Sequence, residues 1–237
     1  MAESLERGKI LEPQKQLEYF RFIGQECRRL SALIENVLDF SRIEQRRKQY
    51  QFEPTDLLAL VRQTVALMQT YAAEKGVDLV LAFSNPQPLG GPQRVGDTPT
   101  SDYQLSLDGH SIQQALVNLI DNALKHSPQG KSVTVGLEMS EAINRKASRG
   151  QGEEEKKVLL SVEDQGPGIP LQEQERIFER FYRLGSELRR ETQGVGIGLS
   201  IVKHVIEAHG GKVTVRSTVG EGSRFTIQLP LENRKSE

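Results

Sequence analysis

Apolar residues recur every three or four positions over several stretches of the chain, and this spacing predicts amphipathic helices. The predicted helices are 17–43, 57–76, 111–126, a short one at 174–181, and 199–209. Thr55 or Asp56 precedes the second helix as a cap, and Gly76 ends it.

Runs of alternating or β-branched apolar residues lie between these helices and predict strands. The predicted strands are 77–83, 103–107, 133–139, 158–162, 212–217 and 224–231. Two polar stretches, 85–100 and 141–157, are predicted loops. Because strands and helices mix without a regular βαβ repeat, we expect an α+β fold. We expect a two-layer sandwich, with helices on one face of a mixed, mostly antiparallel sheet, preceded by a long N-terminal helix.

The first helix carries a continuous apolar seam that includes Phe20, Ile23, Cys27, Leu30 and Ile34. A helix with such a seam needs partners in a bundle. It either folds onto its own domain or forms half of a dimerising helical hairpin whose other half is absent from this chain. The pattern leaves both alternatives open.

Charge and length exclude several classes of function. The 237 residues contain 31 Lys and Arg against 32 Asp and Glu, so no global basic field is available to bind nucleic acid. The longest apolar runs, such as 57–61, fall far short of the roughly 20 residues that cross a bilayer, so we expect a soluble segment without membrane contact. The single cysteine, Cys27, excludes an internal disulfide and suits a reducing compartment.

Two apparent phosphate-binding motifs fail in their context. Gly130-Lys131-Ser132 resembles the end of a P-loop, but Lys125 occupies the position of its first glycine. The glycines of 194–198 resemble a dinucleotide fingerprint, but no strand precedes them and the third comes one residue early. The four histidines and the cysteine show no metal-ligand spacing, so zinc chemistry lacks support.

Four blocks of polar, glycine and aromatic residues remain, and the first is the asparagine box, Asn118–His126. The helical period puts Asn118, Asn122 and Lys125 on one face. An amide oxygen is an acceptable ligand for magnesium, which relies largely on water and nucleotide phosphates. The alternative is a buried pair of asparagines that bond to the backbone.

The first glycine box, Asp164–Pro170, follows a predicted strand directly. A carboxylate at that strand end can accept a hydrogen bond from an exocyclic amine, and the glycines let a planar base approach the backbone. An ordinary β-turn explains the same residues. The phenylalanine box, Ile177–Arg183, offers aromatic anchors and a guanidinium, Arg183, that either clamps a phosphate or is a solvated surface charge.

The second glycine box, Gly194–Ser200, opens directly into a helix, where free amides and the positive helix end face an anion. A weaker third glycine box, Gly220–Phe225, leads into the last predicted strand.

In this order, the boxes resemble those of the sensor histidine kinase ATP-binding domain, a branch of the Bergerat-fold ATPases (GHKL fold). Residues 29–44 are similar to the second helix of that family's dimerisation and phosphotransfer hairpin. The resemblance implies two domains: a partial dimerisation helix over 1–50, and an ATP-binding catalytic domain over 51–237.

The resemblance also implies ATP and Mg²⁺ as cofactors. Asn122 would ligate the metal with Asn118 assisting, and Asp164 would hold the adenine amine. The other implied nucleotide-binding residues are Lys125, His126, Gly166, Gly168, Ile169, Phe178, Phe181, Tyr182, Arg183, Gly194, Gly196, Gly198, Leu199 and Ser223. Asn118, Lys125 and Arg183 are the implied catalytic residues.

The implied activity is that of an ATP:protein-histidine phosphotransferase in a two-component signal transduction pathway. The acceptor would be a histidine on a hairpin that is incomplete here, and phosphate would then pass to an aspartate of a response-regulator receiver domain. Hydrolytic relatives carry a water-activating glutamate where this chain has Asn118, and a neutral amide is a poor general base. Alternatives are a hydrolytic ATPase and an ATP-gated protein-binding module similar to anti-sigma proteins.

None of His110, His126, His204 and His209 has the setting of the family's acceptor histidine. We therefore expect that the chain does not autophosphorylate alone. It would be the cytoplasmic end of a longer, membrane-anchored sensor or a protein that works in trans. A homodimer, a monomer with a folded-back helix and a non-native association are the expected oligomeric states.

Overall fold

The computed structural model describes residues 14–17, 19–20, 23–24, 34, 37–38, 41–43, 45, 47–84, 103–143, 154–184 and 196–231. The chain divides into two units, Met1–Lys48 and Gln49–Glu237. In the first unit the described residues from 14 to 43 are helical, and Phe20 is 60% exposed. Cys27 and Leu30 of the predicted seam lie outside the described residues, so the choice between the two partners of this helix stays open.

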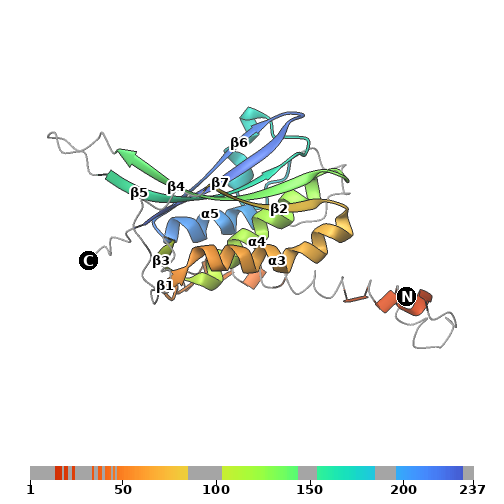
Figure 1. Cartoon of the computed structure of the whole chain (residues 1–237), viewed down its shortest axis with the longest axis horizontal. Coiled ribbons are helices and arrows are strands. Elements are labelled where there is room, and N and C mark those ends of the chain that lie inside the picture. The colour runs from red at the N-terminus through yellow and green to blue at the C-terminus, as the bar shows by residue number, and fades with distance from the viewer. Residues whose placement is uncertain are drawn as a thin grey trace, which may run out of the picture. The chain divides into compact units, whose positions relative to one another are not determined.

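The second unit is a two-layer sandwich, in which three helices cover one face of a five-stranded sheet (Figure 1). The strands run in the order β2 (Asp78–Ser84), β4 (Ser132–Ile143), β5 (Glu154–Asp164), β7 (Gly222–Pro230) and β6 (Lys212–Thr218). Only the β2–β4 pair is parallel; the other pairs of this sheet are antiparallel. The helices are α3 (Leu57–Lys75), α4 (Gly109–His126) and α5 (Gly198–Ala208). The predicted fold class is confirmed.

A small second sheet pairs β1 (Glu53–Asp56) with β3 (Gln104–Leu107) in antiparallel register. The sequence prediction missed β1 because Pro54-Thr55-Asp56 also reads as a helix start. Asp56 serves both elements: it is the last residue of β1, and its Oδ1 accepts a 3.0 Å hydrogen bond from the amide of Ala59 as the N-cap of α3. Gly76 ends α3 in the left-handed conformation, as predicted.

Two sequence predictions are wrong in detail. In place of a helix at 174–181, the chain makes two 3₁₀ turns, η1 (Leu171–Glu173) and η2 (Arg176–Phe178), because the backbone closes hydrogen bonds three residues apart. The predicted loop 141–157 is also too long, since β4 and β5 continue into it, with Ile143 opposite Glu154. Backbone pairing extends this hairpin through polar residues that the apolar pattern assigns to a loop.

The alternation of side chains along β5 places the core and one polar group on the same face. Val158, Leu160 and Val162 are fully buried against the helix layer, and Asp164 is the next residue in this alternation. Burial of each of these apolar side chains stabilises the fold by about 1.5–3 kcal/mol. The packing of the strand therefore also places the Asp164 carboxylate on the helix side of the sheet.

A buried histidine joins the start of α4 to the end of α5. The Nε2 atom of His209 accepts a 3.0 Å hydrogen bond from the amide of Asp108, the N-cap of α4, and its Nδ1 lies 2.7 Å from the carbonyl oxygen of Val205. These partners require a neutral ring with its proton on Nδ1. The rings of Tyr50 and Phe52 pack against it at 5.3 and 4.9 Å between centroids.

The neutral His209 predicts a specific loss of stability in acid. Burial lowers the pKa of His209 below its ordinary 6.5, against the opposing effects of the Val205 carbonyl and the Asp108 charge. As the pH falls, the imidazole of His209 is therefore protonated in the unfolded chain before it is protonated in the folded one. The stabilisation by the neutral ring is complete above pH 6.5 and is lost as the pH falls through the lower pKa of the folded state. Replacing His209 by glutamine, which keeps an acceptor but does not titrate, should lower the free energy of unfolding at pH 7.5 by about 1–2 kcal/mol.

Urea unfolding of the parent and the H209Q variant at pH 7.5 and 5.5 measures the contribution of His209 to the free energy of unfolding. The difference in stability between the two proteins should shrink at pH 5.5. A difference that stays constant with pH would contradict the assignment of a neutral ring.

Candidate functional site

The polar face of α4 points toward the first turn of α5. Asn118 and Asn122 are partly buried on α4, and Asn118 Oδ1 lies 3.8 Å from the position that a Cβ of Gly198 would occupy. The Nδ2 atom of Asn118 is buried and has no hydrogen-bond partner in the described part of the chain. Because an unsatisfied buried donor is unfavourable, Asn118 is suited to a ligand that brings an acceptor.

At the end of β5, Asp164 is 5% exposed and is surrounded by backbone donors. Its Oδ1 accepts a 2.8 Å hydrogen bond from the amide of Gly166, and the amide of Ser223 on β7 also donates to this carboxylate. Burial raises the pKa of Asp164, while these amides and the nearby His126 act in the opposite direction. The structure thus places a buried carboxylate at this strand end, and its role as acceptor for an exocyclic amine stays a prediction.

Gly166 joins the first glycine box to the C-terminal end of α4. A Cβ at this position would lie 2.8 Å from the carbonyl oxygen of His126 and 2.9 Å from Asp164 Oδ1. Both distances are shorter than real Cβ contacts, so a glycine is needed for the close approach. The asparagine box and the first glycine box, which are 38 residues apart between His126 and Asp164, are thus neighbours in space.

The rest of the first glycine box is fastened to the hairpin of β6 and β7. The amide of Ile169 donates to Ser217 Oγ at 2.8 Å, and the Gln174 side chain donates to the carbonyl oxygens of Ile169 and Ser217 at 3.0 and 2.9 Å. The Ser217 and Ser223 hydroxyls are 2.9 Å apart. Gly168 has a φ of 72° and packs so closely on Thr218 that a side chain would overlap the Thr218 carbonyl.

The phenylalanine box meets the second glycine box through its backbone. The amide of Phe181 donates to the carbonyl oxygen of Gly196 at 2.9 Å, and both residues have positive φ angles, 60° and 76°. A positive φ is unfavourable for a bulky residue such as Phe181, so this junction stores backbone strain. The ring of Phe178 packs edge-on against the buried Phe225, with 6.3 Å between ring centroids, whereas the residue Phe181 is 58% exposed.

The structure therefore places most of the predicted site residues on, or directly next to, four neighbouring elements. These residues are Asn118, Asn122, Lys125 and His126 on α4, Asp164, Gly166, Gly168 and Ile169 after β5, Ser223 on β7, and Gly196, Gly198 and Leu199 at the start of α5. Tyr182, under the guanidinium of Arg176, and the exposed Arg183 follow the junction of Phe181 with Gly196. Gly194 lies outside the described residues.

Two residues that the sequence prediction missed lie beside this site. Asp121 accepts a 2.5 Å hydrogen bond from the ammonium group of Lys125 and a hydrogen bond from the hydroxyl of Tyr71 on α3. The four-residue spacing of Asp121 and Lys125 on one helix was the available signal. The contribution of Tyr71 from another helix had no counterpart in the local sequence.

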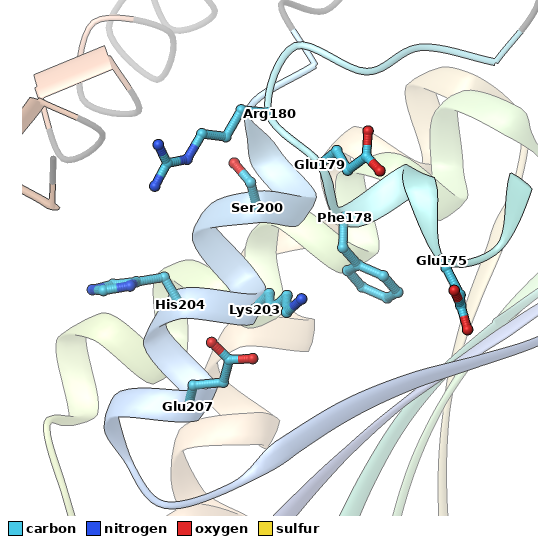
Figure 2. Close-up of a pocket in the computed structure, with 8 residues that line it drawn as sticks. All are labelled: Glu175, Phe178, Glu179, Arg180, Ser200, Lys203, His204 and Glu207. Atoms are coloured by element: carbon cyan, nitrogen blue, oxygen red, sulfur yellow. The ribbon is translucent and has the colours of Figure 1, made fainter.

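A separate hollow of about 380 Å³ lies between η2 and α5 (Figure 2). Its lining is mixed in charge and shares only Phe178 with the predicted site residues. The lining residues are Glu175, Phe178, Glu179, Arg180, Ser200, Lys203, His204 and Glu207. Phe178, Glu179 and Arg180 belong to the phenylalanine box and Ser200 to the second glycine box, but nothing in the sequence indicates that these boxes border a hollow together with the outer face of α5.

None of the helices among the described residues is long and apolar enough to span a membrane. Within the same residues, no three His, Cys, Asp or Glu side chains gather as a metal-binding group.

Comparison with known families identifies one match. The family model described as "Histidine kinase-, DNA gyrase B-, and HSP90-like ATPase" matches residues 107–233. This range contains all of the boxes described above.

Curated relatives match over nearly the whole chain. The chain is 31% identical over 233 residues to the alginate biosynthesis sensor protein KinB of Pseudomonas aeruginosa, covering 98% of this chain and 34% of KinB. It is 28% identical over 237 residues to the sensor histidine kinase WalK of Bacillus subtilis, covering 100% of this chain and 34% of WalK. The chain thus spans about a third of the length of these relatives.

A solved structure has a similar fold. The crystal structure of full-length ShkA in complex with AMPPNP matches with a TM-score of 0.64 and 28% sequence identity, over 94% of this chain and 40% of that chain.

The third glycine box predicts a sharp difference between two of its glycines. Gly220 and Gly222 both have positive φ angles, 87° and 107°, but a Cβ at Gly220 meets open space, whereas one at Gly222 would overlap the Asp164 carbonyl. Gly220→Ala should lower the free energy of unfolding by about 1 kcal/mol through backbone strain alone. Gly222→Ala should lower the free energy of unfolding by about a further 1–3 kcal/mol, because the new methyl group overlaps the Asp164 carbonyl and displaces that residue.

Denaturant unfolding of the two variants measures the difference, and Gly220→Ala is the matched control. Equal losses of stability in both variants would contradict the close contact between Gly222 and the end of β5.

Proposed function

We propose that this chain, which belongs to the family of histidine kinase-, DNA gyrase B- and HSP90-like ATPases, is the ATP-binding catalytic part of a sensor histidine kinase. It would transfer the γ-phosphate of ATP to a histidine on a dimerisation and phosphotransfer hairpin. The phosphate would then pass to an aspartate of a response-regulator receiver domain.

The single observation that carries this proposal is the Asp164 carboxylate. It lies at the end of a buried strand, is 5% exposed, and is flanked by a glycine that approaches the backbone of α4. A fixed acceptor beside a surface without side chains suits the exocyclic amine and the flat ring of adenine. Gly168 and Ile169, fastened to the β6–β7 hairpin, would complete the surface for the base.

The asparagine box suits the phosphate end of the nucleotide together with Mg²⁺. The Nδ2 atom of Asn118, which has no partner among the described residues, could donate a hydrogen bond to a phosphate oxygen. The amide oxygen of Asn122 is a type of ligand that Mg²⁺ accepts. When bound, Mg²⁺ would neutralise phosphate charge. Lys125 and His126 from α4, Arg183 after the phenylalanine box, and the amides at the start of α5 would hold the phosphates.

The chemistry that these residues support is transfer to a protein nucleophile. An imidazole nitrogen of the acceptor histidine would form a bond to the γ-phosphorus as the bond to the bridging oxygen of ADP breaks, and the imidazole would lose its proton to a base beside it. Alignment and charge neutralisation are the main demands of such a step. Asn118 carries no carboxylate that could activate water.

The acceptor would come from outside this catalytic domain. His209 uses both ring nitrogens within the fold, and none of the four histidines has the sequence setting of the family's acceptor. We propose residues 1–50 as part of the dimerisation hairpin, residues 51–237 as the catalytic domain, a homodimer as the working state, and the cytoplasm as the location, because the reaction consumes ATP.

The role of Asp164 predicts the loss of nucleotide binding on removal of one charge. Asp164→Asn should weaken ATP binding by at least about tenfold, because a charged acceptor is replaced by a side chain that also presents donors to the adenine amine. Glu163→Gln is the matched control: it removes the same charge one residue earlier, from the exposed face of β5. Calorimetric titration with and without Mg²⁺ on the parent and both variants measures this.

The expected result is magnesium-enhanced binding in the parent and in the Glu163→Gln variant but not in the Asp164→Asn variant. A folded parent that binds no ATP would sink the proposal and leave an interaction scaffold instead.

The neutral side chain of Asn118 predicts that the domain hydrolyses ATP very slowly. The parent should release phosphate at a rate close to background, whereas Asn118→Glu, which supplies a carboxylate, should raise the release by about tenfold or more. Asn118→Gln is the control of matched size without a base. Release of labelled phosphate from ATP at saturating Mg²⁺ measures the rates.

Steady hydrolysis by the parent that vanishes in an Asn118→Ala variant would instead support a hydrolytic ATPase. Addition of a two-helix hairpin with an acceptor histidine tests the remaining alternative. ATP binding without transfer of label to that hairpin would support the ATP-gated binding module.

A further inference from the structure

Three polar residues from two helices form a chain of interactions at the edge of the proposed phosphate site. The Tyr71 hydroxyl on α3 donates to the Asp121 carboxylate on α4, and Asp121 Oδ2 accepts a 2.5 Å hydrogen bond from Lys125 Nζ. Burial, the charge of Asp121 and its hydrogen bond raise the pKa of Tyr71 to about 12, with a further contribution from Glu74. The tyrosine therefore stays a donor, and the carboxylate lies between a hydroxyl and an ammonium group.

The pair of Asp121 and Lys125 contributes little to folding. The two side chains are 31% and 33% exposed and are spaced four residues apart on one helix. Partly exposed pairs of this kind add little to stability, because water screens the two charges and holding two long side chains together costs entropy. An interaction this weak can exchange readily for a stronger anion, so the pair is a reversible contact of Lys125.

Asp121 also lies close to the residues proposed to bind phosphates. It is adjacent to Asn122 and follows Asn118 by three positions, so all three share the polar side of α4. Its charge reaches His126, whose pKa is lowered by partial burial and by Lys125, against the effects of Asp164 and Asp121. A phosphate chain bound here would meet the negative charge of Asp121 at the same place as the positive charge of Lys125.

We propose that Asp121, aligned by the Tyr71 hydroxyl, is the counter-ion that Lys125 exchanges for the phosphates of the bound nucleotide, and that it thereby limits how much each phosphate adds to the affinity. This inference rests on the proposed nucleotide site and deepens it. Asp121 and Tyr71 are positioning residues that act through Lys125. The nucleoside part of the ligand, at Asp164, lies outside this exchange.

Two consequences distinguish this role from a merely structural one. Removing the Asp121 charge frees Lys125, so affinity should rise for ADP and ATP but not for adenosine, which has no phosphate. The gain should also depend on Lys125, because the exchange is made by its ammonium group.

The experiment titrates adenosine, ADP and ATP into the full chain and its variants by calorimetry. Asp121→Asn should bind ADP and ATP about two- to fivefold more tightly, as expected when one exposed pair no longer competes, and should bind adenosine unchanged. Tyr71→Phe should give a smaller gain of the same kind. Glu74→Gln is the matched control, because it removes a carboxylate that also acts on Tyr71 but does not bond Lys125.

A double-mutant cycle completes the test. In a Lys125→Met background, Asp121→Asn should lose most of its effect on ADP affinity. Weaker or unchanged ADP binding in the single Asp121→Asn variant would overturn the inference, as would an equal gain for adenosine or an equal gain in Glu74→Gln. In each of these cases parent binding still supports the nucleotide site, whereas a parent that binds none of the three ligands overturns both proposals.

Discussion

A charged group at the end of a buried strand has to be compensated on every side, and the candidate site is organised around this requirement. Asp164 continues the inward face of β5 after three buried apolar residues, so strand packing and carboxylate placement are set by the same alternation. The amides of Gly166 and Ser223 supply the donors that a buried carboxylate needs. The first glycine box and β7 therefore meet at the Asp164 carboxylate, and the end of α4 lies against the same glycine box.

Polar groups at the start of α4 and polar groups further along this helix differ in how well the fold satisfies their hydrogen bonds. At the start of α4, His209 and Asp108 satisfy their polar groups within the fold, and the rings of Tyr50 and Phe52 cover them. Further along α4, Asn118 keeps a buried donor without a partner among the described residues. Gln114 Oε1, one turn before Asn118, and Ser127 Oγ are also buried without a hydrogen-bond partner among the same residues. The unsatisfied polar atoms of α4 and its C-cap therefore lie beyond the first turn of the helix, within the asparagine box and next to it.

Sequence patterns predicted what depends on local periodicity and on the order of the boxes. The three long helices of the second unit and its main strands follow from such signals. The β1 strand and the two 3₁₀ turns did not, because backbone pairing and short-range closure, not apolar spacing, decide them. Residues that act across elements, such as Tyr71 on Asp121 and Gln174 on Ser217, have no local pattern. The ligand roles of the site residues stay predictions.

The junction between Phe181 and Gly196 has a consequence for how this domain tolerates change in length. The chain between these residues leaves and returns at a single backbone hydrogen bond, so its two ends are fixed by the domain and not by its own sequence. Lengthening a closed loop costs little, about 0.6 kcal/mol for each doubling. Changes of chain length between residues 184 and 194 should therefore leave the strands and helices in place, whereas Arg183 and Gly194, which border this interval, are proposed nucleotide contacts and limit where it can be varied.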